Sequence, residues 1–168
     1  CSRDWSSDVC SSDLRSPSKA PSRKGGRALP LFFTFEGTEG AGKSTVIRKV
    51  NDWLQNDPAL DGHEVVITRE PGGVPVAEAI RKVLLEQDMD PWTELFLYEA
   101  ARAEHLAQVV QPALARGAIV LCDRFTDSTL AYQGMARGLP WNQIRLLNAL
   151  ATQGLSPART FWLDLPVE

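Results

Sequence analysis

The sequence predicts an α/β fold built on a parallel β-sheet, and three observations support this prediction. Beyond residue 28, short apolar runs alternate with longer amphipathic segments, the pattern of strands joined by crossover helices. Three of the amphipathic segments carry a proline at their start, and proline is favoured in a first helical turn. The length of 168 residues, 43% of them hydrophobic, suits one domain rather than two.

The first half of the domain alternates strands and helices. The apolar run LFFTFE predicts a strand over 31–36, and a glycine-rich turn leads from it into an amphipathic helix over 42–56. Residues 64–68, EVVIT, predict a second strand. A second helix is expected over 75–86, with Pro75 in its first turn.

The second half begins with a long helix over 91–115, in which Pro112 should kink or restart the helix because it lacks a backbone N–H. The run AIVLCD predicts a strand over 118–123, and a short helical piece should follow Arg124. A helix over 140–152 precedes the last strand, at 160–165. Because no helix follows to cover that strand, we expect the C-terminal part of the domain to be missing.

The first 28 residues differ in composition from the rest. Residues 1–22 contain eight serines, and basic residues, prolines and a Gly-Gly pair follow. Such a segment buries too little apolar surface to fold. The stretch CSRDWSSDVCSSDL resembles translated adaptor or vector sequence, so we expect 1–28 to be a disordered, non-native leader and 29–168 to be the domain. A basic tail that contacts acidic partners is the alternative.

Composition excludes several classes of protein. The net charge is −3, and without the six basic and three acidic residues of 1–27 the rest holds 12 basic against 18 acidic residues, so nucleic-acid coating is not expected. Three cysteines cannot form a disulfide framework, which fits a reducing cytoplasm. No apolar run approaches the roughly 18 residues of a membrane span, so we expect no membrane insertion.

A phosphate-binding pattern lies between the first strand and the first helix. Residues 37–44, GTEGAGKS, satisfy G-x-x-x-x-G-K-[ST] in the strand-to-helix setting that this motif needs. The glycines let backbone N–H groups surround an anion, and the helix N-terminus adds positive potential. Lys43 should reach the β- and γ-phosphates of a nucleotide, and the Ser44 hydroxyl should bind Mg²⁺. The alternative is a simple glycine turn with a surface lysine.

An acidic residue ends the third predicted strand. Asp123 follows a continuous apolar run, and parallel sheets bind ligands at the carboxyl ends of their strands. We therefore predict that Asp123 and Ser44 hold Mg²⁺ together, with a strand-end cap as the alternative.

The other motifs are rich in arginine. The D-x-x-G and N-K-x-D segments of guanine-nucleotide switches are absent from the sequence. Arginines instead occur in the segment TREPGG over 68–73, at Arg81 and Arg102, and after Asp123. Guanidinium groups form bidentate hydrogen bonds with phosphate, so this arrangement favours a second, phosphorylated substrate.

The chain closely resembles the bacterial thymidylate kinase family. The matching segments are FEGTEGAGKST at 35–45, TREPGG at 68–73, AEAIRK at 77–82, AARAEH at 100–105 and DRFTDSTLAYQG at 123–134. The resemblance implies a three-layer P-loop NTP hydrolase fold, with four of the family's five strands present. It also implies a homodimer that transfers the γ-phosphoryl group of ATP to dTMP with Mg²⁺, which makes dTDP for dTTP biosynthesis.

The resemblance also assigns roles to single residues. The residues with implied catalytic roles are Lys43, Asp123, Arg124 and Glu39. Glu39 would contact the 3′-hydroxyl of the acceptor's deoxyribose. ATP would bind Gly37, Thr38, Glu39, Gly40, Ala41, Gly42, Lys43, Ser44 and Thr45. Because the loop between Gly37 and Gly42 has no arginine, the chain resembles the bacterial subtype whose catalytic arginines lie in a later LID segment, which we expect to be missing here.

The substrate residues implied by the resemblance form a second set. Tyr98, where the family usually has Phe, would stack on thymine, and Arg102 would reach the O4 edge of the base. Arg81 and Arg124 would clamp the dTMP phosphate. Arg69 and Glu70 would help to shape the wall around that phosphate. Thr129 and Gln133 would lie near the polar edge of the pyrimidine, and Tyr132 would crowd the 2′ position of the sugar.

The sequence also allows other roles for several of these residues and other functions for the chain. Tyr98 could belong to the core, Arg102 could be a solvated helix residue, and Arg69 could be a structural ion-pair partner. The chain could be another nucleoside-monophosphate or deoxynucleoside kinase, or a non-catalytic nucleotide-binding fragment. His63 and His105 lack metal-ligand spacing, and we expect both to be structural or exposed.

Overall fold

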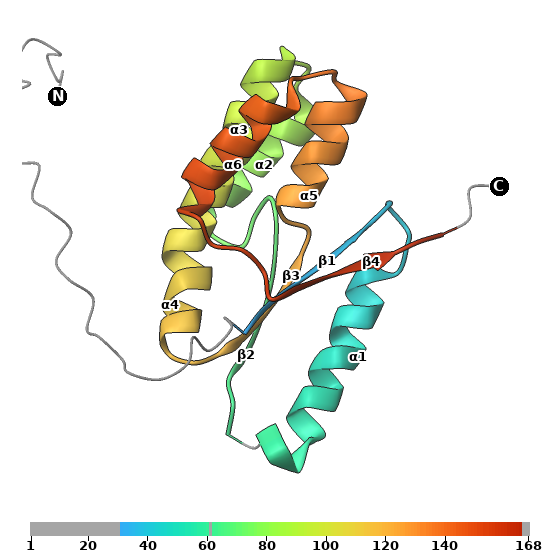
Figure 1. Cartoon of the computed structure of the whole chain (residues 1–168), viewed down its shortest axis with the longest axis vertical. Helices are drawn as coiled ribbons and strands as arrows, with labels where there is room; N and C mark the ends of the chain where they lie inside the picture. Colours follow the sequence, from blue (N-terminus) through green and yellow to red (C-terminus); the bar gives the residue numbers. More distant parts are fainter. Residues whose placement is uncertain (1–30, 61, 166–168) are drawn as a thin grey trace, which may run out of the picture.

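Four parallel strands form the centre of the computed structural model, which describes residues 31–60 and 62–165 (Figure 1). In the order β2-β3-β1-β4, the sheet contains β2 Val65–Arg69, β3 Ile119–Asp123, β1 Phe32–Gly37 and β4 Arg159–Leu163. All three neighbouring pairs are parallel. The predicted parallel α/β sheet is therefore confirmed, whereas the expected leader at 1–28 lies outside the described residues.

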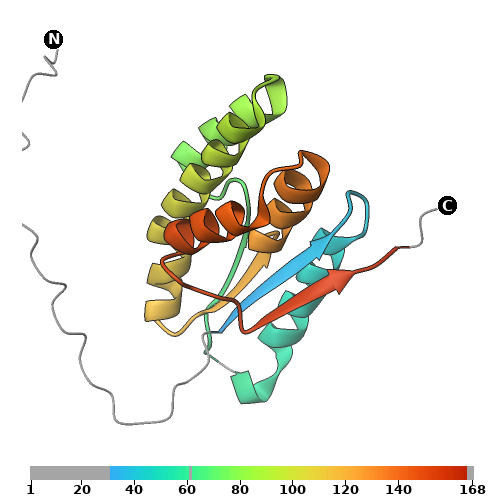
Figure 2. The ribbon, with the colours of Figure 1, turned by 45° about the horizontal axis from the view of Figure 1, so that its top comes forward.

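Helices cover both faces of this sheet. Helix α1 (Lys43–Asn56) lies on one face, and the other long helices lie on the opposite side (Figures 1 and 2). The long helices on that side are α2 (Pro75–Glu86), α3 (Pro91–His105) and α6 (Trp141–Thr152), and the short helices α4 (Gln111–Ala115) and α5 (Thr126–Thr129) accompany them. The sheet and the helices on its two sides make the three layers that the family resemblance implies, and the short turn η1 (Pro58–Leu60) follows α1.

Alternation along the central strand β3 divides the core into two. Val120 and Cys122 pack with Phe32 and Phe125 on the side of α4. The intervening residues, Ile119 and Leu121, pack on the opposite face with Phe35 and with Ile47 of α1. Both faces of a parallel sheet are buried in this way, which explains why its strands appear in the sequence as continuous apolar runs.

Proline positions explain how the helices begin and where one changes. Pro75 and Pro91 occupy the first turns of α2 and α3, whereas Pro140 caps α6, one residue before its start. The helix expected over 91–115 contains a π-helical turn, η2 (Leu106–Val110), immediately before α4. Pro112 has no N–H for a regular helical bond, so the predicted interruption is confirmed.

The sheet ends in a largely exposed strand. Strand β4 covers Arg159–Leu163, slightly shorter than the predicted 160–165, and the side chain of Trp162 is 73% exposed. None of the helices in the described part of the chain is both long and apolar enough to cross a membrane.

Candidate active site

The predicted phosphate loop connects β1 to α1 at the carboxyl edge of the sheet. Gly40 and Gly42 have φ angles of 78° and 84°, a region that residues with side chains rarely adopt. At Gly37 a Cβ atom would lie 2.7 Å from the carbonyl oxygen of Leu163, so the neighbouring strand leaves no room for a side chain. These glycines therefore meet local steric demands of the loop.

Lys43 bends back over the loop. Its Nζ donates to the carbonyl oxygens of Gly37, at 3.1 Å, and Thr38, at 2.8 Å. Burial lowers the pKa of Lys43, and the positive charge of Arg124 acts in the same direction. The ammonium group thus lies inside the loop, where a bound phosphate would replace the carbonyl oxygens as its partner.

Ser44 and Asp123 meet beside this loop. Ser44 Oγ donates to Asp123 Oδ2 at 3.3 Å. The other carboxylate oxygen, Asp123 Oδ1, is the one buried side-chain oxygen or nitrogen within the described residues that lacks a hydrogen-bond partner. A hydroxyl beside an unsatisfied carboxylate oxygen is a donor set that suits Mg²⁺, which binds oxygen and retains several water ligands.

Arg124 follows Asp123 in an uncommon backbone conformation. Its φ angle is 71°, in the left-handed region, which is unusual for a residue other than glycine. The buried Glu36 carboxylate holds the next residues by accepting from Phe125 N–H at 2.7 Å and from Ser128 Oγ at 2.6 Å. Arg124 in turn donates to Ser128 Oγ at 3.1 Å, so Glu36 helps to place the Arg124 side chain.

The role of Glu36 was not predicted from the sequence. Burial raises its pKa, although the hydrogen bonds from Ser128 and Phe125 oppose that effect. Its contacts cross 89 and 92 residues of sequence. The only local signal was a carboxylate inside an apolar strand, which is uncommon unless the group has buried partners.

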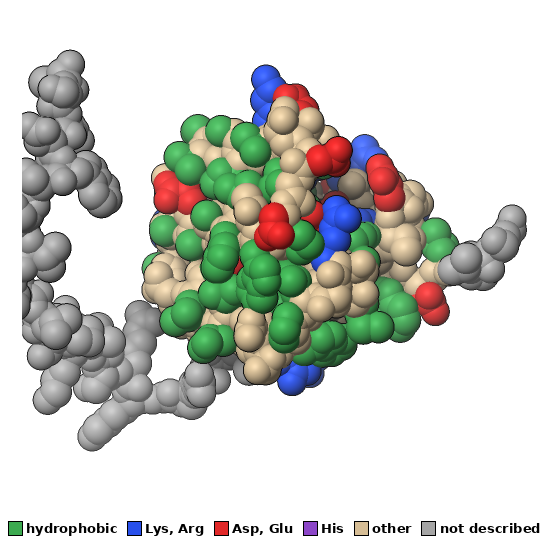
Figure 3. All heavy atoms as spheres, turned by 90° about the horizontal axis from the view of Figure 1, so that it is seen from above, with side chains coloured by type: hydrophobic (Ala, Val, Ile, Leu, Met, Phe, Trp, Pro, Cys, Tyr) green, Lys and Arg blue, Asp and Glu red, His purple; other side chains and the backbone are tan. Residues whose placement is uncertain are grey.

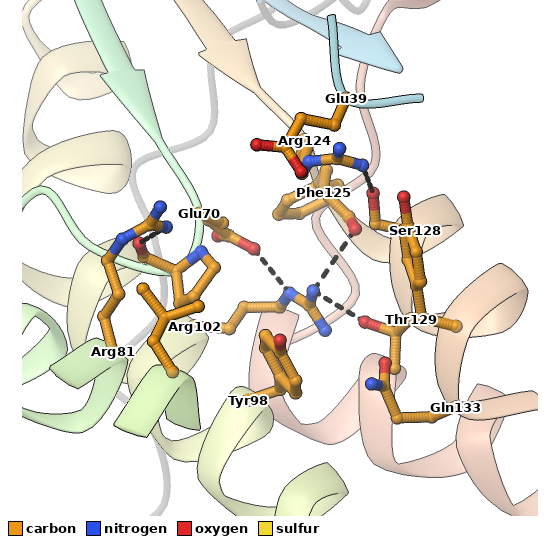
Figure 4. A pocket seen from close by; sticks show the side chains of 13 residues that line it. Glu39, Glu70, Arg81, Tyr98, Arg102, Arg124, Phe125, Ser128, Thr129 and Gln133 are labelled. Carbon is orange, nitrogen blue, oxygen red and sulfur yellow. Dashed lines mark hydrogen bonds and ion pairs between the residues drawn. The ribbon is translucent and has the colours of Figure 1, made fainter. Parts of the chain in front are cut away.

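Arg102 is buried among partners from four segments. Its Nε donates to Glu70 at 2.8 Å, and one terminal nitrogen donates to Glu99 at 3.0 Å and to Asn148 at 2.5 Å. The other terminal nitrogen donates to Thr129 Oγ1 at 2.9 Å and to the Phe125 carbonyl at 3.3 Å (Figure 4). All five N–H groups are therefore engaged, so the alternative of a solvated Arg102 is wrong. The predicted hydrogen bond from Arg102 to the O4 edge of thymine would require it to give up one of these partners.

A buried histidine supports the same network. His105 is fully buried, and its Nδ1 lies 3.0 Å from Glu70 Oε1, while its Nε2 lies 2.6 Å from Thr68 Oγ1. A Cβ atom on Gly73 would lie 2.9 Å from the His105 ring, so this glycine lets the TREPGG segment cross closely over the histidine. Of the two alternatives that the sequence allows for His105, structural or exposed, the structural one is confirmed.

Two adjoining cavities occupy this edge of the sheet. The acceptor cavity, of about 270 Å³, lies between α3 and the β3–α5 connection (Figure 4). The loop cavity, of about 580 Å³, runs along the phosphate loop. Both are lined by Glu39, Glu70, Arg81, Leu85 and Arg124. Seen from above, charged side chains surround a hollow on this side (Figure 3).

The predicted substrate residues divide between these cavities. The acceptor cavity brings together Tyr98, Arg102, Thr129, Tyr132 and Gln133. Arg81 lies at the junction and donates to the Pro71 carbonyl at 3.0 Å. Arg69 borders the loop cavity but pairs with Glu78 at 2.9 Å, which is the ion-pair alternative considered from the sequence.

The predicted ATP-binding residues also divide. Loop residues that line the loop cavity are Glu39, Gly40, Gly42, Lys43, Ser44 and Thr45, whereas Gly37, Thr38 and Ala41 do not line it. Gly37 and Thr38 contribute through the carbonyl oxygens that hold Lys43. The loop that the motif predicts is therefore present, and most of its residues line the loop cavity.

Comparisons with known proteins point to one family. The family model described as Thymidylate kinase matches residues 35–168. The chain is 54% identical over 143 residues to the thymidylate kinase of Geotalea uraniireducens, covering 83% of this chain and 65% of the relative. It is 57% identical over 141 residues to that of Pseudomonas fluorescens strain SBW25, covering 82% and 65%.

A solved structure gives the same answer. The crystal structure of thymidylate kinase from Ehrlichia chaffeensis superposes with a TM-score of 0.75 at 38% identity, covering 82% of this chain and 74% of that one. This chain spans about 65% of the length of the first curated relatives that it matches. Because the family model matches most of the residues of this chain, the chain belongs to the thymidylate kinase family.

Proposed function

We propose that this protein phosphorylates dTMP, transferring the γ-phosphoryl group of ATP to make dTDP for dTTP biosynthesis. The observation that carries the proposal is the junction of the two cavities. The wall around Glu39, Arg81 and Arg124 is shared by the cavity beside Lys43 and the cavity beside Tyr98 and Arg102. Two nucleotides bound there would meet through their phosphates, as in-line transfer requires.

On the ATP side, the chain supplies donors that stabilise phosphate charge. The loop glycines and the start of α1 offer backbone N–H groups, and Lys43 would exchange its carbonyl partners for the β- and γ-phosphate oxygens. Ser44 and Asp123 would hold Mg²⁺, which supplies neutralisation of phosphate charge when bound. Catalysis would depend on positioning and charge stabilisation by these residues.

On the dTMP side, the cavity has an apolar wall and polar ends. Tyr98 would stack on the base, and burial, followed by the nearby Glu94 charge, raises the pKa of its hydroxyl so that the ring remains neutral. Arg81 and Arg124 would hold the acceptor phosphate. The Tyr132 ring, 5.3 Å from the Arg124 guanidinium, would crowd the sugar.

An exposed apolar surface supports the proposed homodimer. Phe96 on α3 is 54% exposed, and Leu146 and Leu150 on α6 are 61% and 66% exposed. Hydrophobic side chains gather on the face seen in Figure 3. Surfaces of this kind mark protein contacts, and sedimentation of the 168-residue chain would give a dimer mass if the proposal is correct.

The proposed reaction is tested by binding and by turnover. Calorimetry should show that the chain binds dTMP more tightly than CMP, UMP or thymidine, and that ATP with Mg²⁺ binds at the same time. Chromatography of a mixture with ATP, Mg²⁺ and dTMP should then show dTDP. Tighter binding of thymidine than of dTMP would instead indicate a nucleoside kinase and would overturn the proposal.

A further inference from the structure

The side-chain amide of Gln133 is held in one orientation by Glu94. Gln133 Nε2 donates to Glu94 Oε1 at 2.6 Å, and Glu94 Oε2 pairs with Arg137 at 2.9 Å. Gln133 is 2% exposed and the Glu94 side chain is 13% exposed. An ionised carboxylate can only accept hydrogen bonds, so the NH₂ group must face Glu94 and the carbonyl oxygen must face elsewhere.

The carbonyl oxygen of Gln133 is available to a ligand. Gln133 lines the acceptor cavity, and within the described part of the chain no hydrogen bond is made to its Oε1. This oxygen is not among the fully buried atoms that lack a partner. The cavity therefore presents a hydrogen-bond acceptor at this position.

Thr129, four residues earlier, presents the opposite character. Its Oγ1 accepts a hydrogen bond from Arg102 at 2.9 Å, so its own proton remains available for donation. Thr129 and Gln133 lie together on one side of the cavity, with Tyr98 across from Gln133 (Figure 4). A base stacked on Tyr98 would thus meet a donor and an acceptor along its edge.

We propose that Glu94 is a specificity-positioning residue that acts through Gln133 and makes the acceptor cavity select thymine or uracil over cytosine. This inference rests on the proposed function. Thymine carries an N3–H donor beside the O4 acceptor, which complements Gln133 Oε1 and the Thr129 hydroxyl. Cytosine has an unprotonated N3 beside an amino group, so its N3 lone pair would face the Gln133 carbonyl oxygen.

Glu94 prevents the rearrangement that would admit cytosine. Rotation of the Gln133 amide by half a turn would offer NH₂ to cytosine N3 but would place the carbonyl oxygen against the Glu94 carboxylate. Glutamine at position 94 could donate as well as accept, so it would tolerate either orientation. Sites built to hydrogen-bond a particular group discriminate strongly because an unmatched buried polar group is costly.

The test compares Glu94→Gln with wild type and with a matched control, Arg137→Gln, which removes the other partner of Glu94 but leaves the bond from Gln133. Calorimetry with the full chain measures dissociation constants for dTMP, dCMP and 2-deoxyribose 5-phosphate, which lacks a base. We expect Glu94→Gln to lower the preference for dTMP over dCMP by about tenfold. Affinity for the base-free phosphate should stay unchanged, and Arg137→Gln should keep the wild-type preference.

A second measurement does not depend on nucleotide binding. In wild type, the ¹⁵N spectrum should show slowly exchanging Gln133 side-chain NH₂ signals, assigned by their loss in Gln133→Leu. These signals should exchange rapidly in Glu94→Gln. Rapid exchange already in wild type would show that Glu94 does not fix the amide and would overturn the inference.

The outcomes separate this inference from the proposed function. A wild-type chain that binds dTMP no better than dCMP would overturn both. A wild type that discriminates between them, with a Glu94→Gln variant that discriminates equally well, would overturn the inference alone. An equal loss of affinity for all three ligands would show a structural effect of Glu94 and would also overturn it.

Discussion

Ser44 and Asp123 are separated by 79 residues in the sequence, yet Ser44 Oγ donates to Asp123 Oδ2 at 3.3 Å. The first residue lies in the turn that begins α1 and the second ends β3. Pairing of β1 with β3, in which Phe35 lies opposite Asp123, brings the two together. The sheet register therefore creates the proposed metal site.

The first prediction concerns Asp123→Asn. Wild type should bind ATP more tightly with Mg²⁺ than with EDTA. In the variant the ratio of these two affinities should be smaller by at least about tenfold, because a neutral amide is a poor Mg²⁺ ligand. Calorimetry in the two buffers measures the difference. Folding stability should change little, because the Asn amide oxygen can still accept the exposed bond from Ser44 Oγ and the buried Asp123 Oδ1 has no partner to lose. An undiminished Mg²⁺ effect would rule out Asp123 as a ligand.

Lys43→Ala should reduce phosphoryl transfer to dTMP by about 100-fold or more, because it removes the charge held within the phosphate loop. Rates of dTDP formation by the protein and its variants provide the measurement. Lys49→Ala, on the exposed side of the same helix, is the matched control and should behave as wild type. If both variants lost activity equally, the effect would not belong to the loop.

Arg102→Ala should destabilise the fold as well as weaken dTMP binding. Removing one partner of a buried ion pair costs about 3–5 kcal/mol, and Glu70 and Glu99 would both lose Arg102. Arg69→Ala is a matched control, because its pair with Glu78 is exposed and should be worth at most about 1 kcal/mol. Urea unfolding measures both. Unchanged dTMP affinity in a folded Arg102→Ala variant would count against the base-site assignment.

Tyr132→Ala should relax the preference for deoxyribose. Loss of the ring would open space at the sugar, and the ratio of affinities for dUMP and UMP should fall by about tenfold, whereas Tyr132→Phe should keep it. Both ligands are measured by calorimetry. The Tyr132 ring also lies over Arg124, so the Ala variant should bind both dUMP and UMP more weakly than wild type does. A steady dUMP/UMP ratio would refute the sugar role.

Glu36→Gln should change how stability depends on pH. Burial raises the pKa of Glu36 above its ordinary 4.5, so the native state binds this proton more tightly than the unfolded state does. Wild-type stability from this group is therefore present below pH 4.5 and falls as pH rises through the raised native pKa. Denaturant unfolding across pH should show a shallower fall in the variant. Parallel curves for both proteins would contradict the raised pKa.

The sequence predicted the parts of the molecule that depend on local pattern. Strand and helix positions followed from apolar periodicity and proline placement, and the glycine spacing predicted the strand-to-helix loop around Lys43. Asp123 could be placed at the same edge because parallel strands share their carboxyl ends. The structure brings these residues together, while their catalytic roles remain predictions.

Partners across long sequence separations could not be predicted in this way. Glu36 contacts Ser128, and Arg102 contacts Asn148, only because the sheet and helices fold against one another. Glu99 lies one turn before Arg102 on the same helix, but a local i,i+3 pair does not by itself distinguish a buried arginine from a solvated one. The burial of Arg102 depends on distant partners such as Glu70. His105 likewise acquires Thr68 and Glu70 as partners through packing.

The full set of hydrogen bonds around Arg102 has a consequence for the energetics of recognition. An interfacial side chain that becomes ordered on association loses about 0.5–1.5 kcal/mol of conformational freedom. Arg102 is ordered during folding by buried partners, whereas the Arg69 side chain is 55% exposed and its pair with Glu78 lies in solvent. Substrate capture would then be entropically inexpensive at the pyrimidine, and any slow adaptation would be confined to the guanidinium groups around the phosphates.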